Sequence, residues 1–159
     1  MSTAYVGVGS NLGDRLGNLR KAKRVLAEKS GIEDIRTSPF YETEPVGGPG
    51  DSPKYLNGVW EINTALSPAE LLETLRDVED SFGRTRPFAD APRTLDLDLL
   101  VWDDMVLDEG DLKLPHPKMH ERFFVMKPFS DLAPQWMHPG YKKSAKQLME
   151  ALLANSKEA

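Results

Sequence analysis

The chain has 159 residues, with 20 Lys and Arg against 25 Asp and Glu, which gives a formal net charge of −5. This length predicts one domain, residues 1–159, that buries about two thirds of the unfolded surface, and the negative charge disfavours non-specific binding to nucleic acid phosphates. The sequence contains no cysteine, which excludes disulfides, thiol catalysis and thiolate zinc sites. It shows neither a basic and apolar leader nor a long apolar run, so we expect a cytoplasmic protein without a membrane segment.

The N-terminal forty residues predict a strand, a helix and a second strand. Residues 3–10 are short and β-rich, and Asp14 can cap a helix whose apolar residues recur on one face. Gly31 is the expected end of this helix, because glycine readily adopts the left-handed conformation that ends helices. Residues 32–41 again have the character of a strand.

The next segment predicts a loop, a third strand and a second helix. Residues 44–50 combine Gly and Pro too densely for a regular element, and residues 55–66 return to strand character. Ser67 and Glu70 match a capping box with a proline at the first helical position. We therefore expect a helix that begins there and ends near residues 82–83.

Residues 94–102 have the pattern of a half-buried strand, because their first six positions alternate polar and apolar. The prolines that follow predict short pieces, until Ser144 and Gln147 form a second capping box before a final helix. The order of the first six elements, strand, helix, two strands, helix and strand, is the ferredoxin-like β-α-β-β-α-β pattern. We expect an α+β fold, in which helices pack on an antiparallel sheet, followed by a C-terminal hairpin and short helices.

Two aspartates in the last of these strands are the most informative residues. Side chains two positions apart in a strand point to the same face, about 7 Å apart, so Asp96 and Asp98 are expected side by side. The leucines between and around them form the opposite, core-directed face, and the apolar far end of the strand predicts that it is not an edge strand. Carboxylates of this kind suit Mg²⁺, which commonly takes one or two of them and completes its shell with water and phosphates.

Three arginines in the preceding loop bear on how these carboxylates are interpreted. A lone pair of aspartates on a strand is more often a solvated face that pairs with Lys or Arg. Arg84, Arg86 and Arg93 add positive charge beside them, however, and guanidinium groups suit phosphate recognition. Carboxylates with Mg²⁺ and several arginines together favour phosphoryl or pyrophosphoryl transfer from ATP.

Six short motifs, in order along nearly the whole chain, carry a resemblance to a known family. They are G-S-N-L-G-D at 9–14, Y-E-T-E-P-V-G at 41–47, Y-L-N at 55–57, G-R-T-R at 83–86, R-T-L-D-L-D at 93–98 and L-P-H-P at 114–117. In these motifs the chain resembles 6-hydroxymethyl-7,8-dihydropterin pyrophosphokinase of folate biosynthesis.

The resemblance implies an Mg²⁺-dependent transferase that moves the pyrophosphoryl group of ATP to the hydroxymethyl oxygen of the pterin and releases AMP. Two Mg²⁺ ions would bind Asp96 and Asp98, and Arg84 and Arg93 would contact the transferring group. The partners would be small molecules, ATP and a reduced pterin, with no nucleic acid and no membrane, and the protein would be a monomer.

The resemblance also places residues around each substrate. The positions that match the nucleotide site are Glu79, Arg84, Arg86, Arg93, Leu99, Leu112, His116 and Arg122. The positions that match the pterin site are Thr43, Val46, Tyr55, Asn57 and Phe124. Aromatic faces stack well on a flat heterocycle, and an Asn amide offers both a donor and an acceptor for its edge.

Taken singly, most of these residues have a simpler interpretation. Tyr55 and Phe124 are of the type that usually packs in a core, and Asn57 is compatible with a strand-end cap. For His116, which lies between two prolines, the simpler interpretation is that it orients a turn. By its helical spacing Glu79 is expected on the exposed side of its helix.

The chain departs from the family pattern before its aspartates. The family commonly has R-W-G-P-R there, whereas this chain has Ala89, Asp90, Ala91, Pro92 and Arg93, without the tryptophan and the glycine. An alternative function is therefore a catalytically weakened homologue that binds nucleotide and pterin. An RNA-binding module is disfavoured by the net charge and by the aspartates on the sheet.

Overall fold

The computed structural model describes residues 1–43, 54–82 and 94–158. The elements in chain order are β1 (Ser2–Ser10), α1 (Arg15–Ala27), β2 (Ile32–Thr37), β3 (Tyr41–Thr43), β4 (Tyr55–Thr64), α2 (Pro68–Ser81), β5 (Asp96–Trp102), β6 (Leu107–Glu109), β7 (Leu112–Leu114), the 3₁₀ turn η1 (Met119–Glu121), α3 (Phe123–Leu132) and α4 (Ala145–Glu158). All three predicted N-caps are present, since the side chains of Asp14, Ser67 and Ser144 accept main-chain N–H groups of the helices that follow them.

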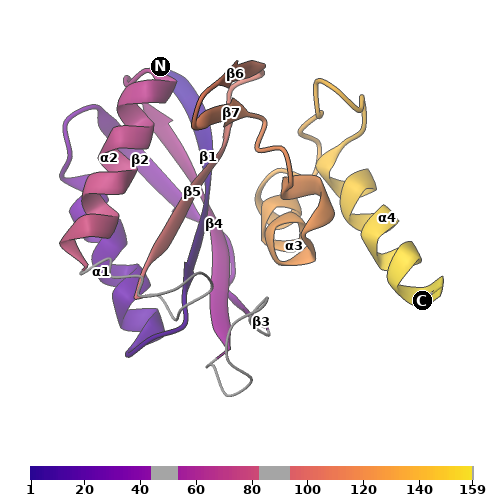
Figure 1. The fold of residues 1–159 in the computed structure, drawn as a ribbon, viewed down its shortest axis with the longest axis horizontal. Helices are drawn as coiled ribbons and strands as arrows, with labels where there is room; N and C mark the ends of the chain where they lie inside the picture. Colours follow the sequence, from indigo (N-terminus) through magenta and orange to yellow (C-terminus); the bar gives the residue numbers. More distant parts are fainter. Residues whose placement is uncertain (44–53, 83–93, 159) are drawn as a thin grey trace.

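The main sheet is antiparallel, with the strand order β2-β4-β1-β5. This is the expected ferredoxin-like arrangement, in which the first and third strands of the motif lie side by side in the middle (Figure 1). The remaining strand, β3, pairs with the first residues of β4, and β6 and β7 form the expected hairpin. The predicted α+β fold is thus confirmed.

The strand expected over residues 32–41 is two strands, so that prediction was wrong in its extent. β2 ends at Thr37 and β3 begins at Tyr41. Between them Ser38 donates its N–H to Val59 O and accepts the Val59 N–H on its hydroxyl oxygen, both at 2.9 Å. The next residue is Pro39, which has no N–H to continue the ladder, so the chain turns out of the sheet there.

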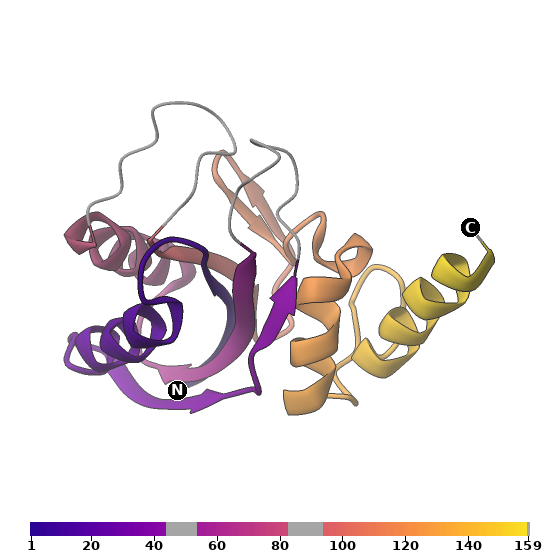
Figure 2. The same ribbon diagram turned by 90° about the horizontal axis from the view of Figure 1, so that it is seen from below.

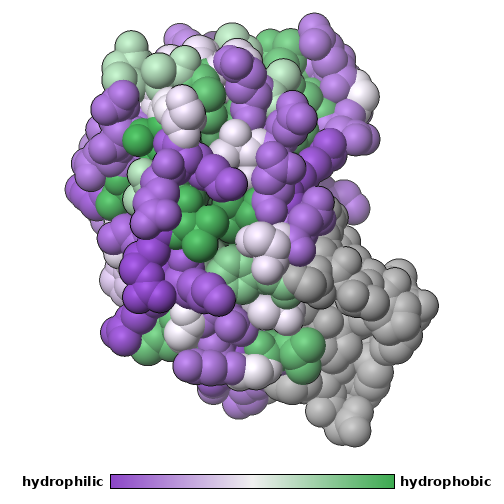
Figure 3. All heavy atoms as spheres, turned by 90° about the vertical axis from the view of Figure 1, so that its left-hand side faces the viewer, coloured by the Kyte–Doolittle hydropathy of each residue, from purple (hydrophilic) through white to green (hydrophobic). Residues whose placement is uncertain are grey.

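Helices cover both faces of the sheet (Figure 2). Helices α1 and α2 lie on one side, over a core that includes Trp60, Leu97 and Leu99, and α3 packs on the other side around Phe129 and Met126. α4 lies outside α3 and packs against it. The outer face of the α1 and α2 layer is largely hydrophilic, as expected for amphipathic helices (Figure 3). Within the described residues, no helix has the length and apolarity needed to cross a membrane.

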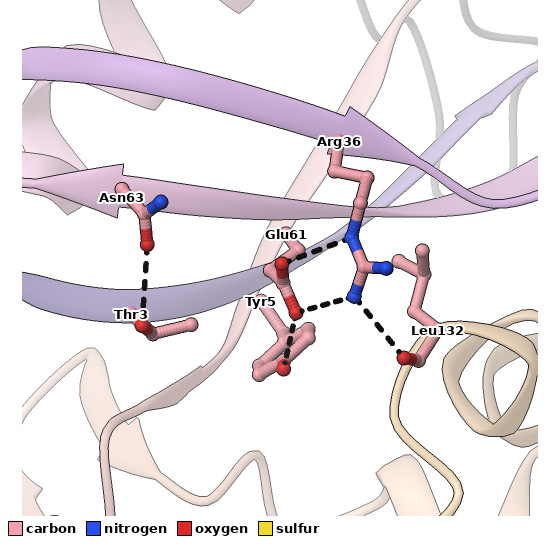
Figure 4. Close-up of polar contacts among 6 residues, drawn as sticks. All are labelled: Thr3, Tyr5, Arg36, Glu61, Asn63 and Leu132. Atoms are coloured by element: carbon pink, nitrogen blue, oxygen red, sulfur yellow. Dashed lines mark hydrogen bonds and ion pairs between the residues drawn. The ribbon is translucent and has the colours of Figure 1, made fainter.

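A polar network fastens the end of α3 to the sheet (Figure 4). Arg36 of β2 donates two hydrogen bonds to the Glu61 carboxylate of β4, both at 3.0 Å, and a third of 3.2 Å to Leu132 O at the end of α3. The hydroxyl of Tyr5 donates to the same carboxylate at 2.7 Å, while its ring packs on Phe129. The guanidinium thus satisfies a carbonyl at the C-terminal end of the helix, where a cation is favourable.

The strand of the two aspartates lies at the edge of the main sheet, contrary to the prediction from its apolar far end. Within the described residues, β5 has one strand neighbour in this sheet, β1. Its other side is covered by Glu79 of α2, which accepts the Leu97 N–H, and by His116, which donates its main-chain N–H to Leu100 O. The apolar residues of β5 therefore reflect helices on both faces of the strand and not a central place in the sheet.

Candidate functional site

Asp96 and Asp98 project from the same face of β5, as predicted. Asp96 is half-buried and Asp98 is exposed, whereas Leu95, Leu97 and Leu99 are buried against α1 and α2 on the opposite face. The two carboxylates border two different pockets. They are therefore in a position to contact two ligands at once.

The larger pocket has a volume of about 290 Å³ and lies at the open edge of β5. Four of the residues predicted near the nucleotide line it together with the two aspartates: Glu79, Leu99, Leu112 and His116. Arg76 also lines it and pairs with Asp111 of the β6 to β7 turn at 3.1 Å. The pocket thus joins α2, β5 and the hairpin, with apolar and charged groups on different walls.

His116 presents a neutral imidazole to this pocket. Its Nδ1 accepts the Lys118 N–H at 3.1 Å, so in the neutral ring Nε2 carries the hydrogen and can donate to a ligand. Burial lowers the pKa of His116 below its ordinary value, and the positive charges of Arg122 and Lys118 lower it further. The ring is therefore a hydrogen-bond donor without a charge near pH 7.

The smaller pocket, about 30 Å³, lies on the sheet face that α3 covers. A row of register partners runs across it, from Asn57 on β4 through Gly9 on β1 to Asp96 on β5, with Gly7 opposite Asp98 in the next row. A Cβ atom on Gly9 would lie 3.1 Å from Asn57 Oδ1 and would fill this space. Glycine therefore keeps the face open between the amide and the carboxylates.

Aromatic and polar side chains surround the row. Phe124, at the start of α3, lines the smaller pocket, and the Arg122 guanidinium lies 5.8 Å from the centre of its ring. Asn57 Nδ2 donates to Thr43 Oγ1, and Tyr55 lies beside Gly9. The structure thus brings together the described residues predicted for the pterin, although the linings of the two pockets do not include Thr43, Tyr55 or Arg122.

Four predicted site residues lie outside the described residues: Val46, Arg84, Arg86 and Arg93. For Glu79, the expectation of an exposed side chain was wrong. Its residue is 3% exposed, and Oε2 accepts the Leu97 N–H at 2.8 Å. Helical spacing did not reveal this, because the partner is a main-chain group on another element.

Gly7, Gly9 and Val125 also line the smaller pocket, and none of them was predicted as a site residue from the sequence. A signal for the glycines was present in the alternation Val6, Gly7, Val8, Gly9. The valines face the α1 and α2 core, so the glycines share the opposite face, where a missing side chain leaves room.

The described donor set fits Mg²⁺ in part. Within residues 1–43, 54–82 and 94–158, no group of three or more His, Asp or Glu side chains forms a candidate metal cage. A pair of carboxylates is nevertheless the usual protein share of an Mg²⁺ site, because this ion retains water and binds substrate phosphates. Asp96 and Asp98, beside a pocket open to ligand, meet that requirement.

Comparison with known proteins shows the family of the chain. A family model described as 7,8-dihydro-6-hydroxymethylpterin-pyrophosphokinase (HPPK) matches residues 5–134. A 2-amino-4-hydroxy-6-hydroxymethyldihydropteridine pyrophosphokinase of Synechocystis sp. is 44% identical over 147 residues, which are 92% of this chain and 74% of the relative. The protein of the same name from Bacillus subtilis is 41% identical over 132 residues, 83% of this chain and 78% of the relative.

Solved structures share the fold. A structure of HPPK-DHPS in complex with substrates has a TM-score of 0.76 at 13% identity, over 99% of this chain and 44% of that one. A Plasmodium falciparum HPPK-DHPS triple mutant with pteroate has a TM-score of 0.75 at 14% identity, again over 44% of its chain. The present chain thus spans less than half of these solved chains, and at such identity they show the fold alone. The family model and the curated relatives carry the conclusion: the chain belongs to the 7,8-dihydro-6-hydroxymethylpterin-pyrophosphokinase family.

Proposed function

We propose that the chain transfers the β,γ-pyrophosphoryl group of ATP to 6-hydroxymethyl-7,8-dihydropterin. The hydroxymethyl oxygen attacks the β-phosphorus, the bond from that phosphorus to the α,β-bridging oxygen breaks, and the hydroxyl proton is released. The products are AMP and the pterin diphosphate. The observation that carries this proposal is the place of Asp96 and Asp98, which border both the larger pocket beside α2 and the smaller pocket under α3.

In this proposal ATP occupies the larger pocket. Leu99 and Leu112 offer apolar contacts to its base, and the neutral His116 ring donates a hydrogen bond from Nε2. The triphosphate would point toward Asp96 and Asp98. Arg84, Arg86, Arg93 and Arg122 are proposed as the cations that share its charge.

The pterin is proposed to bind on the sheet face beside Asn57. The amide would bond the edge of the heterocycle, and Phe124 and Tyr55 would flank its faces. Because the pocket of about 30 Å³ is smaller than a bicyclic ring, binding requires these aromatic side chains to move apart. Thr43 and Val46 are assigned to the same site.

Asp96 and Asp98 are proposed to hold Mg²⁺, two ions with ATP bound. When bound, Mg²⁺ neutralises phosphate charge and makes the β-phosphorus more electrophilic. The carboxylates themselves fix the position of the triphosphate relative to the pterin alcohol, which is the main requirement of this reaction class. We also propose that the protein acts as a monomer in the cytoplasm, where its lack of cysteine suits a reducing environment.

The test is direct. The protein is incubated with MgATP and the pterin alcohol, and nucleotides and pterins are separated by chromatography. Equal amounts of AMP and pterin diphosphate are expected. ADP as the nucleotide product would refute pyrophosphoryl transfer, and binding of both substrates without turnover would identify the weakened homologue instead.

A further inference from the structure

Glu79 is a buried carboxylate that accepts a hydrogen bond from a main-chain amide. The residue is 3% exposed, and its Oε2 accepts the N–H of Leu97 at 2.8 Å. An ionised carboxylate is costly to bury unless it is hydrogen-bonded, so this contact is part of what keeps Glu79 in the fold. Leu97 is the residue between Asp96 and Asp98.

The place of Leu97 at a sheet edge explains why it needs a partner. In an edge strand, alternate residues direct their N–H and C=O groups away from the neighbouring strand. β5 pairs with β1 on one side, and the Leu97 N–H points to the other side, toward α2. Glu79 therefore takes the place of a missing strand in the middle of the segment that bears both aspartates.

A second contact restrains the same edge farther along the strand. The main-chain N–H of His116 donates to Leu100 O at 2.8 Å. The segment from Asp96 to Leu100 is thus held on its outer side at two points, one from α2 and one from the loop after β7. Glu79, Leu97 and His116 all line the larger pocket.

We infer that Glu79 is a positioning residue for the metal-binding strand: by holding the Leu97 amide, it keeps the Asp96 and Asp98 carboxylates on one face and at a fixed separation. Rotation of the Leu97 peptide would turn the two neighbouring Cα–Cβ bonds apart, because side-chain direction in a strand follows the backbone. Glu79 acts through the strand and does not need to touch nucleotide or metal. The inference rests on the proposed function in one respect, the binding of Mg²⁺ by the two aspartates.

Two substitutions distinguish the effect of the length of the Glu79 side chain from the effect of its charge. Glu79→Gln keeps the length of the side chain and an acceptor oxygen but loses the charge. Glu79→Asp keeps the charge but is one methylene shorter and cannot reach Leu97 without a shift of the backbone. Val78→Ala is the matched control, because Val78 is a fully buried neighbour in α2 whose side chain packs in the core.

The first measurement is amide hydrogen exchange at Leu97 in the ligand-free protein. Glu79→Asp is expected to raise the exchange rate about tenfold or more relative to Val78→Ala, since the amide loses its partner. Glu79→Gln is expected to stay within about threefold of the unchanged protein. The second measurement is calorimetric titration with Mg²⁺ in the presence of a non-hydrolysable ATP analogue. Glu79→Asp is expected to bind Mg²⁺ about tenfold more weakly, and Glu79→Gln is expected to be affected less.

The outcomes are distinct. If Glu79→Gln weakens Mg²⁺ binding more than Glu79→Asp, the charge or a direct ligand contact is what matters, and the positioning role is overturned. If Glu79→Asp exposes the Leu97 amide yet leaves Mg²⁺ affinity unchanged, the contact is structural only, which also overturns it. Failure of the unchanged protein to form AMP refutes the proposed reaction, while the exchange and binding results still decide the role of Glu79.

Discussion

Asn57 and Thr43 are joined by a hydrogen bond of 2.5 Å from Nδ2 to Oγ1, across the β3 and β4 pair. This bond fixes the rotation of the Asn57 amide. Its Oδ1 then lies toward Gly9, on the side of the smaller pocket, where it can accept a hydrogen bond from a ligand. Thr43 therefore contributes to the proposed pterin site through its side chain, by orienting the Asn57 amide.

Asn57→Ala is expected to weaken pterin binding and to leave nucleotide binding nearly unchanged. The substitution removes hydrogen bonds at the heterocycle and none at the phosphates, with an expected loss of about 1–3 kcal/mol in pterin binding. Calorimetric titration with a non-reactive pterin analogue, with a non-hydrolysable nucleotide present, measures the pterin affinity, and a separate titration with the nucleotide measures the nucleotide affinity. The control is Asn63→Ala, at the far end of β4, where the amide oxygen accepts from the Thr3 hydroxyl. Equal pterin affinity in the two variants would give Asn57 a structural role.

Asp96→Asn and Asp98→Asn are each expected to abolish most turnover with little change in thermal stability. Each removes a negative ligand for Mg²⁺ while nearly conserving volume, and Asp98 is exposed, so its folded environment loses little. AMP formation and thermal unfolding are measured on the same preparations. Asp104→Asn, in the exposed turn after β5, is the control for the loss of one negative charge.

A different result for the aspartates would point to structural pairing. If each carboxylate instead serves as the partner of an arginine, its loss leaves a charge unpaired and lowers the free energy of unfolding by several kcal/mol where the pair is buried. Lower stability with retained turnover would contradict the metal assignment.

Local signals in the sequence predicted the ferredoxin-like core well. The capping box at Ser67 and Glu70 is present, and the alternation over residues 94–99 directs Leu95, Leu97 and Leu99 into the core. The division of the strand over residues 32–41 was missed, because it depends on a bond between Ser38 and a strand that follows in sequence. Such a contact has no local pattern.

The parts of the candidate site that could be predicted from the sequence are those that follow from the alternation of a strand or from the family resemblance. The shared face of Asp96 and Asp98 follows from the period of a strand. The environment of Glu79 and the edge position of β5 do not, since both depend on how α2 and the hairpin pack beside the strand. Strand order is a tertiary property, and an apolar edge strand can result when helices cover its faces.

The network of Arg36, Glu61 and Tyr5 predicts acid-sensitive stability (Figure 4). Burial by itself raises the pKa of Glu61, but the hydrogen bonds from Arg36 and Tyr5 and the charge of Arg36 outweigh it and hold the pKa below its ordinary value. A carboxyl with a lowered pKa stabilises the fold above its unfolded value, near 4.5, and this stability is lost as the pH falls through the folded pKa.

Glu61→Gln should therefore cost more at pH 7 than at pH 3. We expect a loss of about 1–2 kcal/mol at pH 7, kept modest because Arg36 is more than half exposed, and a smaller loss at pH 3, because below the unfolded pKa the stability that comes from the lowered pKa of Glu61 declines. Urea unfolding at the two pH values measures the difference. Glu73→Gln, on the exposed side of α2, is the control for the loss of one carboxylate. If Glu61→Gln lowers the free energy of unfolding equally at both pH values, ionisation of Glu61 does not stabilise the fold.

His138 is expected to cause a second, smaller loss of stability at acidic pH. Its Nδ1 accepts the main-chain N–H groups of Gly140 and Tyr141, at 3.0 and 3.2 Å, which requires the neutral ring. Burial lowers its pKa below the ordinary 6.5, and the positive charge of His120 lowers it further. Folding thus favours the neutral form of His138. Its contribution to the free energy of unfolding is complete above pH 6.5 and is lost as the pH falls toward the folded pKa.

His138→Asn keeps an acceptor near the position of Nδ1 but does not titrate. The variant should have a lower melting temperature at pH 8, because the ring contacts with Tyr141 and Trp136 are lost, and a smaller fall between pH 8 and pH 5 than the unchanged protein. Thermal unfolding at the two pH values checks this. If the melting temperature of the variant falls as much as that of the unchanged protein, other groups cause the loss of stability at acidic pH.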